Sequence, residues 1–309
     1  NRYCSSGMQT ISMAASQVMA GCYDAVIAGG AETISMMGAQ NMDNFVNPRL
    51  AAEYPGIYHP MGITAECVAD RYNVSREAQD EYALESQMRT AAAQEAGIYA
   101  DEIVPMDTKM MLMNKETGEA KEVDVTVDKD ECNRPTTTIE GLASLKPVFA
   151  ENGSVTAGNS SGLNDGTATI LIASEEGVSN HGLKPMARIV ESAVVGVEPC
   201  QMGIGPVQAT NKALEKAGLK MDDMDIIELN EAFSAQSLAC IRQWGLNDDD
   251  IRINPNGGAI ALGHPLGMSG TRIIQTAAIE LKKQGKKYAL ATMCVGVGQG
   301  YAVIIKNVN

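Results

Sequence analysis

The sequence predicts an α/β fold made of two similar halves with a different region inserted between them. The main observation is a weak internal repeat, in which a glycine, a helical stretch, a second glycine and an apolar strand follow one another. The paired glycines are 14 residues apart near the start of the chain and 15 apart near its end. The two copies comprise Gly7, helix 8–20, Gly21 and strand 25–30, and Gly270, helix 271–284, Gly285 and strand 288–293. Two helix–strand units of one kind indicate two α/β halves.

The remaining elements fit this division. In the inserted region, Ser75 and Gly97 are typical caps of a helix over 76–96, and the polar stretch 114–130 indicates a surface hairpin or loop. In the second half, the strand 225–230 delivers Asn230 to its C-terminal end, where α/β sheets usually bind ligands. A buried strand is expected over 166–174 and a helix over 209–217. The predicted domains are 1–34 with 162–182 (first half), 35–161 (inserted loop domain) and 183–309 (second half).

Composition restricts the classes of function. With 45% hydrophobic and 20% charged residues, the chain is expected to be globular and soluble. Its net charge of −14 and the lack of clustered basic residues argue against nucleic-acid binding, since the basic run 282–287 suits a helix end. No apolar stretch is long enough to span a membrane. The seven cysteines are scattered without a C-x-x-C pair, which favours free thiols in a reducing compartment (the cytoplasm, if the source is bacterial) over disulfides or a zinc site.

Cys4 is the first candidate for chemistry. It stands in Cys4-Ser5-Ser6-Gly7 at the start of a predicted helix. The helix dipole and free backbone N–H groups there would lower the pKa of the thiol and favour thiolate. The alternative is a small buried residue in a helix cap. This segment alone supports both interpretations equally.

Three further segments could carry chemistry. His264 lies in the glycine-rich stretch 254–270, which matches no phosphate-binding pattern, and its alternative is a packed structural histidine. Cys294 follows a buried strand and precedes alternating glycines whose N–H groups could form an oxyanion hole, although taken alone it is better explained as buried. Asn230 could orient a water or a carbonyl, or could cap the helix that follows.

Together, four ordered segments resemble the signatures of the thiolase family. They are Cys4-Ser5-Ser6-Gly7, Asn230-Glu231-Ala232-Phe233, Gly263-His264-Pro265-Leu266-Gly267 and Cys294-Val295-Gly296-Val297-Gly298. The stretches 155–162 and 61–66 also resemble thiolase segments, so that the resemblance covers the whole chain. It implies a layered αβαβα fold of two similar halves with an inserted loop domain.

The resemblance also implies a set of catalytic roles. Cys4 would take the acyl group as a thioester, and His264 would accept its proton and help to hold the thioester oxygen of the acetyl-CoA that is enolised. Cys294 would be the base at the acetyl methyl group, and Asn230 would position a water in the same oxyanion hole. The backbone N–H groups of Cys4 and Gly296 would form a second hole.

The resemblance further implies the ligands and partners. Ser161, Met61 and Phe233 would line the path of the pantetheine arm. Coenzyme A and acyl-CoA would be substrates, with no metal and no cofactor. A homodimer is expected, with a dimer of dimers or membership of a β-oxidation complex as alternatives.

Two departures from the family pattern favour a degradative 3-ketoacyl-CoA thiolase of fatty-acid β-oxidation over a biosynthetic acetyl-CoA acetyltransferase. His59-Pro60-Met61 stands where synthetic members have His directly before Met, and the stretch 35–59 lacks the long basic loop of tetrameric members.

Two other classes of protein compete with this interpretation. They are a ketoacyl synthase, against which Cys294 argues, and a catalytically silent CoA- or lipid-binding protein. The opening fifth of a usual thiolase is absent, so we expect the functional polypeptide to begin upstream of Asn1, with strands there flanking the apolar strand 25–30.

Overall fold

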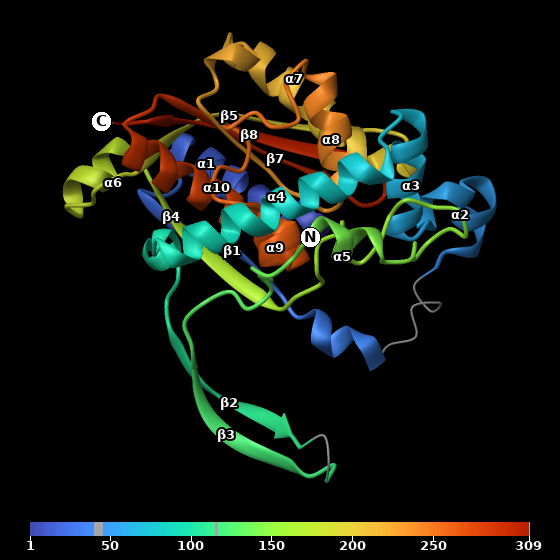
Figure 1. Ribbon diagram of the computed structural model, residues 1–309. Coiled ribbons are helices and arrows are strands. Elements are labelled where there is room, and N and C mark those ends of the chain that lie inside the picture. The colour runs from blue at the N-terminus through green and yellow to red at the C-terminus, as the bar shows by residue number, and fades with distance from the viewer. Residues whose placement is uncertain (40–45, 115–116, 309) are drawn as a thin grey trace.

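Two β-sheets with a pair of helices between them form the body of the chain (Figure 1). This computed structural model describes residues 1–39, 46–114 and 117–308. The strands are β1 (Ala25–Glu32), β2 (Met106–Met113), β3 (Ala120–Val127), β4 (Gly166–Ala173), β5 (Ala187–Gly196), β6 (Ile226–Leu229), β7 (Tyr288–Val295) and β8 (Gln299–Asn307). The α-helices are α1 (Ser6–Met19), α2 (Pro48–Glu53), α3 (Met61–Arg71), α4 (Arg76–Glu95), α5 (Ile139–Ala143), α6 (Glu175–Asn180), α7 (Gly205–Ala217), α8 (Ser234–Gln243), α9 (Ala259–Leu262) and α10 (Leu266–Gln284). Short 3-10 helices are η1 (Tyr3–Ser5), η2 (Ile34–Ala39), η4 (Pro55–Tyr58), η5 (Ile98–Asp101), η6 (Pro199–Ile204) and η7 (Met221–Asp223).

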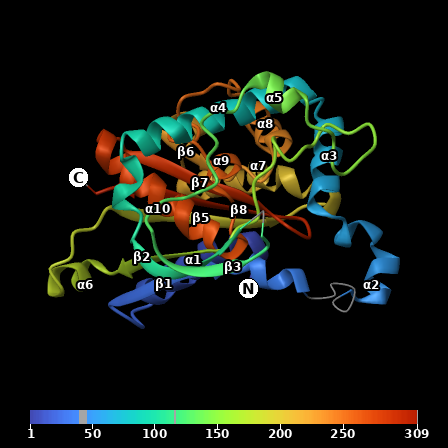
Figure 2. The ribbon, with the colours of Figure 1, turned by 60° about the horizontal axis from the view of Figure 1, so that its bottom comes forward.

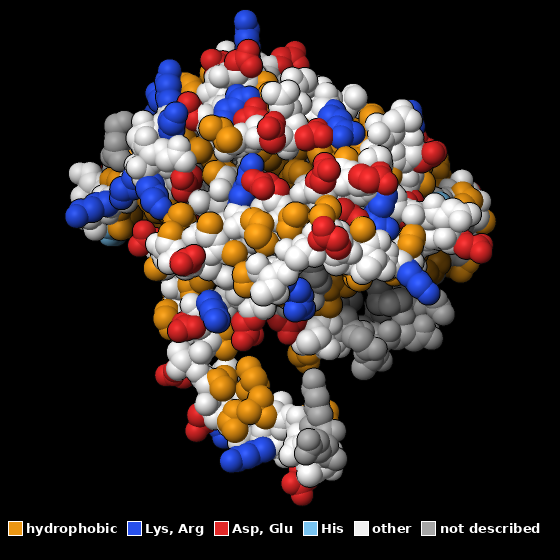
Figure 3. All heavy atoms as spheres, in the orientation of Figure 1, with side chains coloured by type: hydrophobic (Ala, Val, Ile, Leu, Met, Phe, Trp, Pro, Cys, Tyr) orange, Lys and Arg blue, Asp and Glu red, His pale blue; other side chains and the backbone are white. Residues whose placement is uncertain are grey.

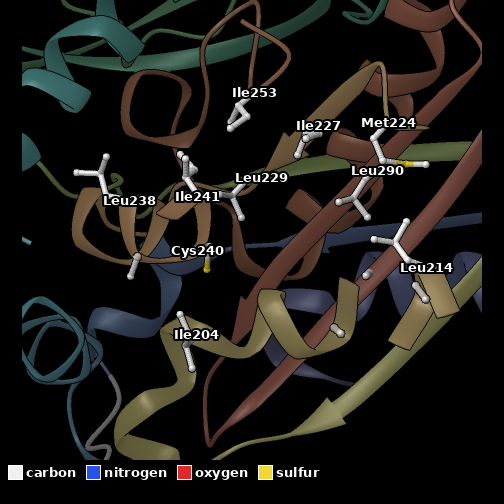
Figure 4. Close-up of a cluster of buried hydrophobic side chains, with 14 of the residues drawn as sticks. Ile204, Leu214, Met224, Ile227, Leu229, Leu238, Cys240, Ile241, Ile253 and Leu290 are labelled. Atoms are coloured by element: carbon white, nitrogen blue, oxygen red, sulfur yellow. The ribbon is translucent and has the colours of Figure 1, made fainter. Parts of the chain in front are cut away.

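Three strands of the larger sheet, β6, β7 and β8, are buried on both faces. The strand order of this sheet is β5-β8-β7-β6, in which β6 and β7 run parallel and the other neighbours antiparallel. Alternate side chains face opposite ways. Leu290 packs against side chains of α7 and α8 (Figure 4), in the same cluster as Ile304, whereas Ala291 and Val303 pack against α10. Because helices cover both faces, β7 is buried along nearly its whole length, as the sequence predicted for 288–293, whereas the edge strand β5 is partly exposed and carries Arg188 and Glu191.

Helices α1 and α10 lie together between the two sheets (Figures 1 and 2). The predicted helices over 8–20 and 271–284 are confirmed, and Gly285 ends the second in a left-handed conformation. Both helices begin earlier than predicted, at Ser6 and Leu266. The glycines that were expected to precede them therefore lie inside them.

Those two glycines allow the helices to touch. A Cβ atom on Gly7 would lie 2.6 Å from the backbone nitrogen of Thr271, and one on Gly270 would lie 2.7 Å from that of Met8. Real Cβ atoms do not approach so closely, so only glycine fits at this crossing. The repeat seen in the sequence thus brings the starts of its two helices into contact, next to Cys4 and His264.

The smaller sheet consists of β1 and β4. The two predicted strands are confirmed, and they pair with each other in antiparallel register, with Ala25 opposite Ala173 and Glu32 opposite Gly166. The prediction that both strands are buried is wrong for the described residues. Ile27 is 74% exposed and Leu171 is 48% exposed, because the described chain covers this pair with helices on one face only.

The inserted region contains the long helix α4 and a projecting hairpin (Figure 1). Ser75 caps α4 as predicted, by accepting a hydrogen bond from the N–H of Ala78. Ala96, not Gly97, is the C-cap residue, and Gly97 follows it with a positive φ. The predicted hairpin is confirmed by the antiparallel pairing of β2 with β3, although β2 lies before residue 114 and only β3 falls inside the predicted stretch.

Parts of two sequence predictions lie outside the described residues. They are 115–116, within the predicted hairpin, and 40–45, within the short stretch 35–59.

On the face drawn in Figure 3, acidic and basic side chains are interspersed, and apolar side chains gather on the projecting hairpin. Among the described helices, none is both long enough and apolar enough to cross a membrane.

Candidate active site

Four segments far apart in the sequence meet near the starts of α1 and α10. Cys4 lies in η1 just before α1, and His264 lies between α9 and α10. Asn230 follows β6, and Cys294 lies near the end of the adjacent strand β7. The parallel pairing of β6 with β7 brings Asn230 and Cys294 to the same end of the sheet, where the backbone N–H of Asn230 donates to Thr292 at 3.0 Å.

Cys4 is half-buried and packs against the cluster between the sheets. Burial raises the pKa of its thiol above the ordinary value, while the backbone N–H groups of Gly296 and of Cys4 itself act in the opposite direction. The prediction of a lowered pKa is therefore wrong, because desolvation outweighs the N–H groups. The same two N–H groups, which the family resemblance assigns to an oxyanion hole, interact with the Cys4 sulfur in this structure.

His264 is buried, with 3% of its surface exposed, and its hydrogen bonds define its tautomer. The Ser269 hydroxyl donates to the carbonyl of Pro265 at 3.0 Å and lies 2.6 Å from His264 Nδ1. A hydroxyl that donates its one proton to the Pro265 carbonyl accepts the proton of Nδ1–H, and we infer this tautomer for His264. His264 Nε2 is then unprotonated and lies 3.4 Å from the Asn230 side-chain nitrogen.

The pKa of His264 is lowered to about 4, first by burial and then by the charge of Arg272. The ring is consequently neutral at physiological pH and can accept a proton at Nε2. Because the pKa of Cys4 is raised and that of His264 is lowered, the pair rests as thiol and imidazole. It does not rest as a thiolate–imidazolium ion pair.

Cys294 is buried, and burial raises the pKa of its thiol well above the usual range, with nearby Cys4 the next cause. The chain then turns through Gly296, Val297 and Gly298 into β8. Val297 and Gly298 both have positive φ angles, 69° and 87°. This tight turn after β7 presents the N–H of Gly296 to Cys4.

Asn230 is 2% exposed, and its side-chain oxygen has no hydrogen-bond partner in the described part of the chain. A buried amide oxygen usually has one, and a site that binds a polar ligand or a water would supply it. The helix-cap alternative does not hold, since Phe233 occupies the N-cap position of α8.

The three residues expected to contact pantetheine lie beside these groups. Met61 and Phe233 pack in one apolar cluster with Cys294, and the Met61 sulfur lies 3.5 Å from where a Gly296 Cβ would be. The N–H of Ser161 donates to the carbonyl of Ala232 at 3.0 Å. Ser161 is thus held next to the segment that carries Asn230.

The sequence did not reveal Ser269, whose hydroxyl contacts the His264 ring. It also did not reveal the hydrogen bonds that the Glu231 side chain makes to other segments. The signal for Ser269 was its position five residues after His264, which places it one turn into α10.

All seven cysteines are free thiols. Within residues 1–39, 46–114 and 117–308, no group of histidine, cysteine or acidic side chains is arranged to hold a metal ion.

This arrangement is suited to acyl transfer. A nucleophilic thiol next to a neutral base and two backbone donors can form a covalent thioester. A second thiol near an unsatisfied amide and the same imidazole can move a proton to or from a carbon beside a carbonyl.

Comparisons with known proteins identify the family of the chain. The thiolase N-terminal domain matches residues 1–176, and the thiolase C-terminal domain matches residues 183–307. A beta-ketoadipyl-CoA thiolase of Acinetobacter baylyi is 49% identical over 100% of this chain and 79% of its own length. A 3-oxoadipyl-CoA/3-oxo-5,6-dehydrosuberyl-CoA thiolase of Escherichia coli K12 is also 49% identical, with the same coverage.

Solved structures give the same result. Human mitochondrial 3-ketoacyl-CoA thiolase superposes with a TM-score of 0.87 at 42% identity, covering all of this chain and 78% of its own. The structure of that human enzyme in complex with CoA has the same TM-score and identity and covers 77% of its own chain. The chain therefore belongs to the thiolase family of acyltransferases.

Proposed function

We propose that this chain catalyses thiolytic cleavage of 3-ketoacyl-CoA through an acyl-enzyme on Cys4. The observation that carries the proposal is the meeting of two thiols, a neutral imidazole and an amide with a free oxygen at one site. Coenzyme A enters as a substrate, and each proton in the sequence below has a donor and an acceptor among these groups. No metal or organic cofactor is needed for that chemistry.

In the first half-reaction, Cys4 attacks the ketone carbon of the substrate and His264 Nε2 takes the thiol proton. The N–H groups of Cys4 and Gly296 stabilise the oxyanion of the tetrahedral intermediate. The bond between the second and third acyl carbons then breaks, which leaves the acyl group on Cys4. The electron pair stays with the departing acetyl-CoA as an enolate.

The enolate oxygen is held by the newly protonated His264 Nε2 and by a water bound to Asn230. Cys294 protonates the enolate carbon, a step for which the raised pKa of its thiol is suited because the group rests protonated. In the second half-reaction, the Cys294 thiolate takes the proton of an incoming CoA thiol. That thiol displaces the shortened acyl group from Cys4, and His264 returns its proton to the leaving sulfur.

The names of the relatives support a narrower class of acyl-CoA substrate. Those that are 47% to 49% identical have names that specify 3-oxoadipyl-CoA, whose acyl tail ends in a carboxylate. A 45% identical relative from Chromobacterium violaceum has the name acetyl-CoA acetyltransferase, which makes the biosynthetic reaction the second candidate. We favour thiolysis of a 3-oxo-dicarboxylyl-CoA over cleavage of unsubstituted fatty acyl chains.

Thiolysis of three substrates tests this proposal: acetoacetyl-CoA, 3-oxohexanoyl-CoA and 3-oxoadipyl-CoA. The last two have equal chain length and differ in the terminal carboxylate, so that their kcat/KM ratio isolates the contribution of that group. We expect the ratio to favour 3-oxoadipyl-CoA. A preference for 3-oxohexanoyl-CoA would assign the chain to ordinary β-oxidation, and activity on acetoacetyl-CoA alone would assign it to the biosynthetic type.

We also propose that the chain acts as a homodimer. The exposed Ile27 and Leu171 on the outer face of β1 and β4 support association. Light scattering of the purified protein should give a mass of at least two chains, and a stable monomer would contradict this proposal.

A further inference from the structure

Glu231, the residue after Asn230, is a buried carboxylate with four hydrogen-bond donors around it. It is 1% exposed. The donors are the Tyr82 hydroxyl (3.2 Å), the Ser86 hydroxyl (2.6 Å), the Asn254 side-chain amide (2.8 Å) and the Ile260 backbone N–H (3.2 Å). Because these donors come from α4, from α9 and from the loop before α9, one side chain joins three segments.

Two of these donors lead directly to the proposed catalytic groups. The Asn254 side chain also donates to the carbonyl of Leu229 and accepts from its N–H, each at 2.8 Å, which fixes the end of β6 just before Asn230. Ile260 lies in α9, the short helix that ends immediately before Gly263 and His264. Glu231 therefore joins the strand end that precedes Asn230 to the short helix that precedes His264.

The surroundings of Glu231 leave little freedom. A Cβ atom on Gly258 would lie 2.4 Å from the Glu231 carboxyl carbon, so the loop before α9 packs directly on the carboxylate. Tyr82, Ser86, Asn254 and Glu231 also line a cavity of about 200 Å³. Since four donors already occupy the carboxylate oxygens, Glu231 is poorly suited to bind a ligand in that cavity.

We propose that Glu231 is a positioning residue that sets the separation between the Asn230 amide and the His264 ring, the pair that holds the enolate oxygen. This inference rests on the roles proposed above for Asn230 and His264. It predicts that a change at Glu231 slows proton transfer at the enolate carbon, which uses this pair, more than it slows acylation of Cys4, which uses Cys4 and Gly296.

Glu231→Gln is the sharpest perturbation, because it keeps the shape of the side chain and exchanges one acceptor oxygen for a donor NH2 group. Facing Asn254, that NH2 would meet another amide donor; facing Ile260, it would meet a backbone N–H. In either orientation a buried donor loses its acceptor, and the separation of Asn230 from His264 must change.

The test compares two readouts in the full chain. Exchange of the α-protons of acetyl-CoA with D2O reports the enolate pair, and iodoacetamide alkylation, quantified on the peptide that contains Cys4, reports access to that thiol because the other cysteines, among them the exposed Cys22, lie on other peptides. Glu231→Gln should slow the exchange about tenfold to hundredfold, as expected for a misplaced catalytic group, with little change in alkylation or in KM for the thioester. The matched control is Glu228→Gln: Glu228 is also buried, on β6, and one of its carboxyl oxygens has no hydrogen-bond partner among the described residues, so an amide of the same shape should leave the exchange rate close to that of the wild type.

A double-mutant cycle separates positioning from general structural damage. If Glu231 acts through Asn230, Glu231→Gln should slow exchange by less than about twofold in an Asn230→Ala background. Additive effects, or equal losses of exchange and alkylation, would overturn the proposal. Should Glu231→Gln fail to fold, Ser86→Ala removes one donor and must still slow exchange more than alkylation.

The wild-type protein distinguishes this inference from the proposed function. If the wild type shows neither exchange nor thiolysis, the proposed function fails, and the inference fails with it. If the wild type shows both activities and Glu231→Gln equals it, only the positioning role is wrong.

Discussion

Replacement of Ser269 by alanine tests how the fold prepares His264 as a base. Ser269 accepts the Nδ1–H proton of His264 and thereby leaves Nε2 free to accept a proton. Alanine cannot accept that proton, so the buried Nδ1–H loses its partner. The alternative tautomer, with the proton on Nε2, would then become favourable, and it cannot accept a proton from Cys4.

The magnitude follows from the burial of both groups. Ser269 is 4% exposed and His264 is 3% exposed, so water is a poor replacement for the lost acceptor. A buried donor without a partner costs about 1–3 kcal/mol. At about 1.4 kcal/mol for each factor of ten, the rate of Cys4 acylation should fall roughly fivefold to 150-fold.

The assay is single-turnover transfer of the acetyl group from acetyl-CoA to Cys4, followed by quenching and mass spectrometry. Ser12→Ala is the control, because the Ser12 hydroxyl is buried without a hydrogen-bond partner among the described residues and its removal should leave the rate unchanged. An acylation rate in Ser269→Ala equal to that of the wild type would refute the assignment of the His264 tautomer.

Three further predictions follow from the geometry. Cys294→Ser should still form the acyl-enzyme on Cys4 but should lose about 10²-fold or more in α-proton exchange of acetyl-CoA, measured by deuterium incorporation; wild-type exchange would exclude Cys294 as the base. Because burial and Arg272 hold the pKa of His264 at about 4, its neutral form persists above that pH, and the acid limb of kcat/KM for acyl transfer should lie near pH 4 and not near 6.5. Gly270→Ala should lower the free energy of unfolding by about 1–3 kcal/mol in urea titrations, since its Cβ would overlap a backbone nitrogen of α1, while Gly196→Ala, whose Cβ meets nothing, should not.

The sequence predicted the elements that local signals determine. Helical spacing, an N-cap serine and terminal glycines located α1, α4 and α10, and apolar runs located β1, β4 and β7. The helix starts were placed too late because Gly7 and Gly270 were interpreted as helix boundaries. Both positions need glycine because two helices more than 250 residues apart in sequence touch there. No local sequence pattern reveals such a contact.

The site could be predicted in its residues but not in its electrostatics. Motifs identified Cys4, His264 and Cys294, and the structure brings Cys4 near Cys294 and His264 next to Asn230. The raised pKa of Cys4 was missed because a helix start indicates a dipole, whereas desolvation depends on the sheet and α10 that pack over the thiol. Ser269 and Glu231 were missed for a related reason: their roles lie in the hydrogen bonds they make to other segments.

Mapping the acylated cysteine by mass spectrometry decides whether Cys4 carries the acyl group. The protein is incubated with acetoacetyl-CoA without free CoA, quenched in acid, digested and mapped by mass spectrometry. The account predicts one acetyl group, on the peptide that contains Cys4, and its removal when CoA is added before the quench. An acetyl group on any of the other cysteines, or one that persists in a folded Cys4→Ala variant, would contradict it.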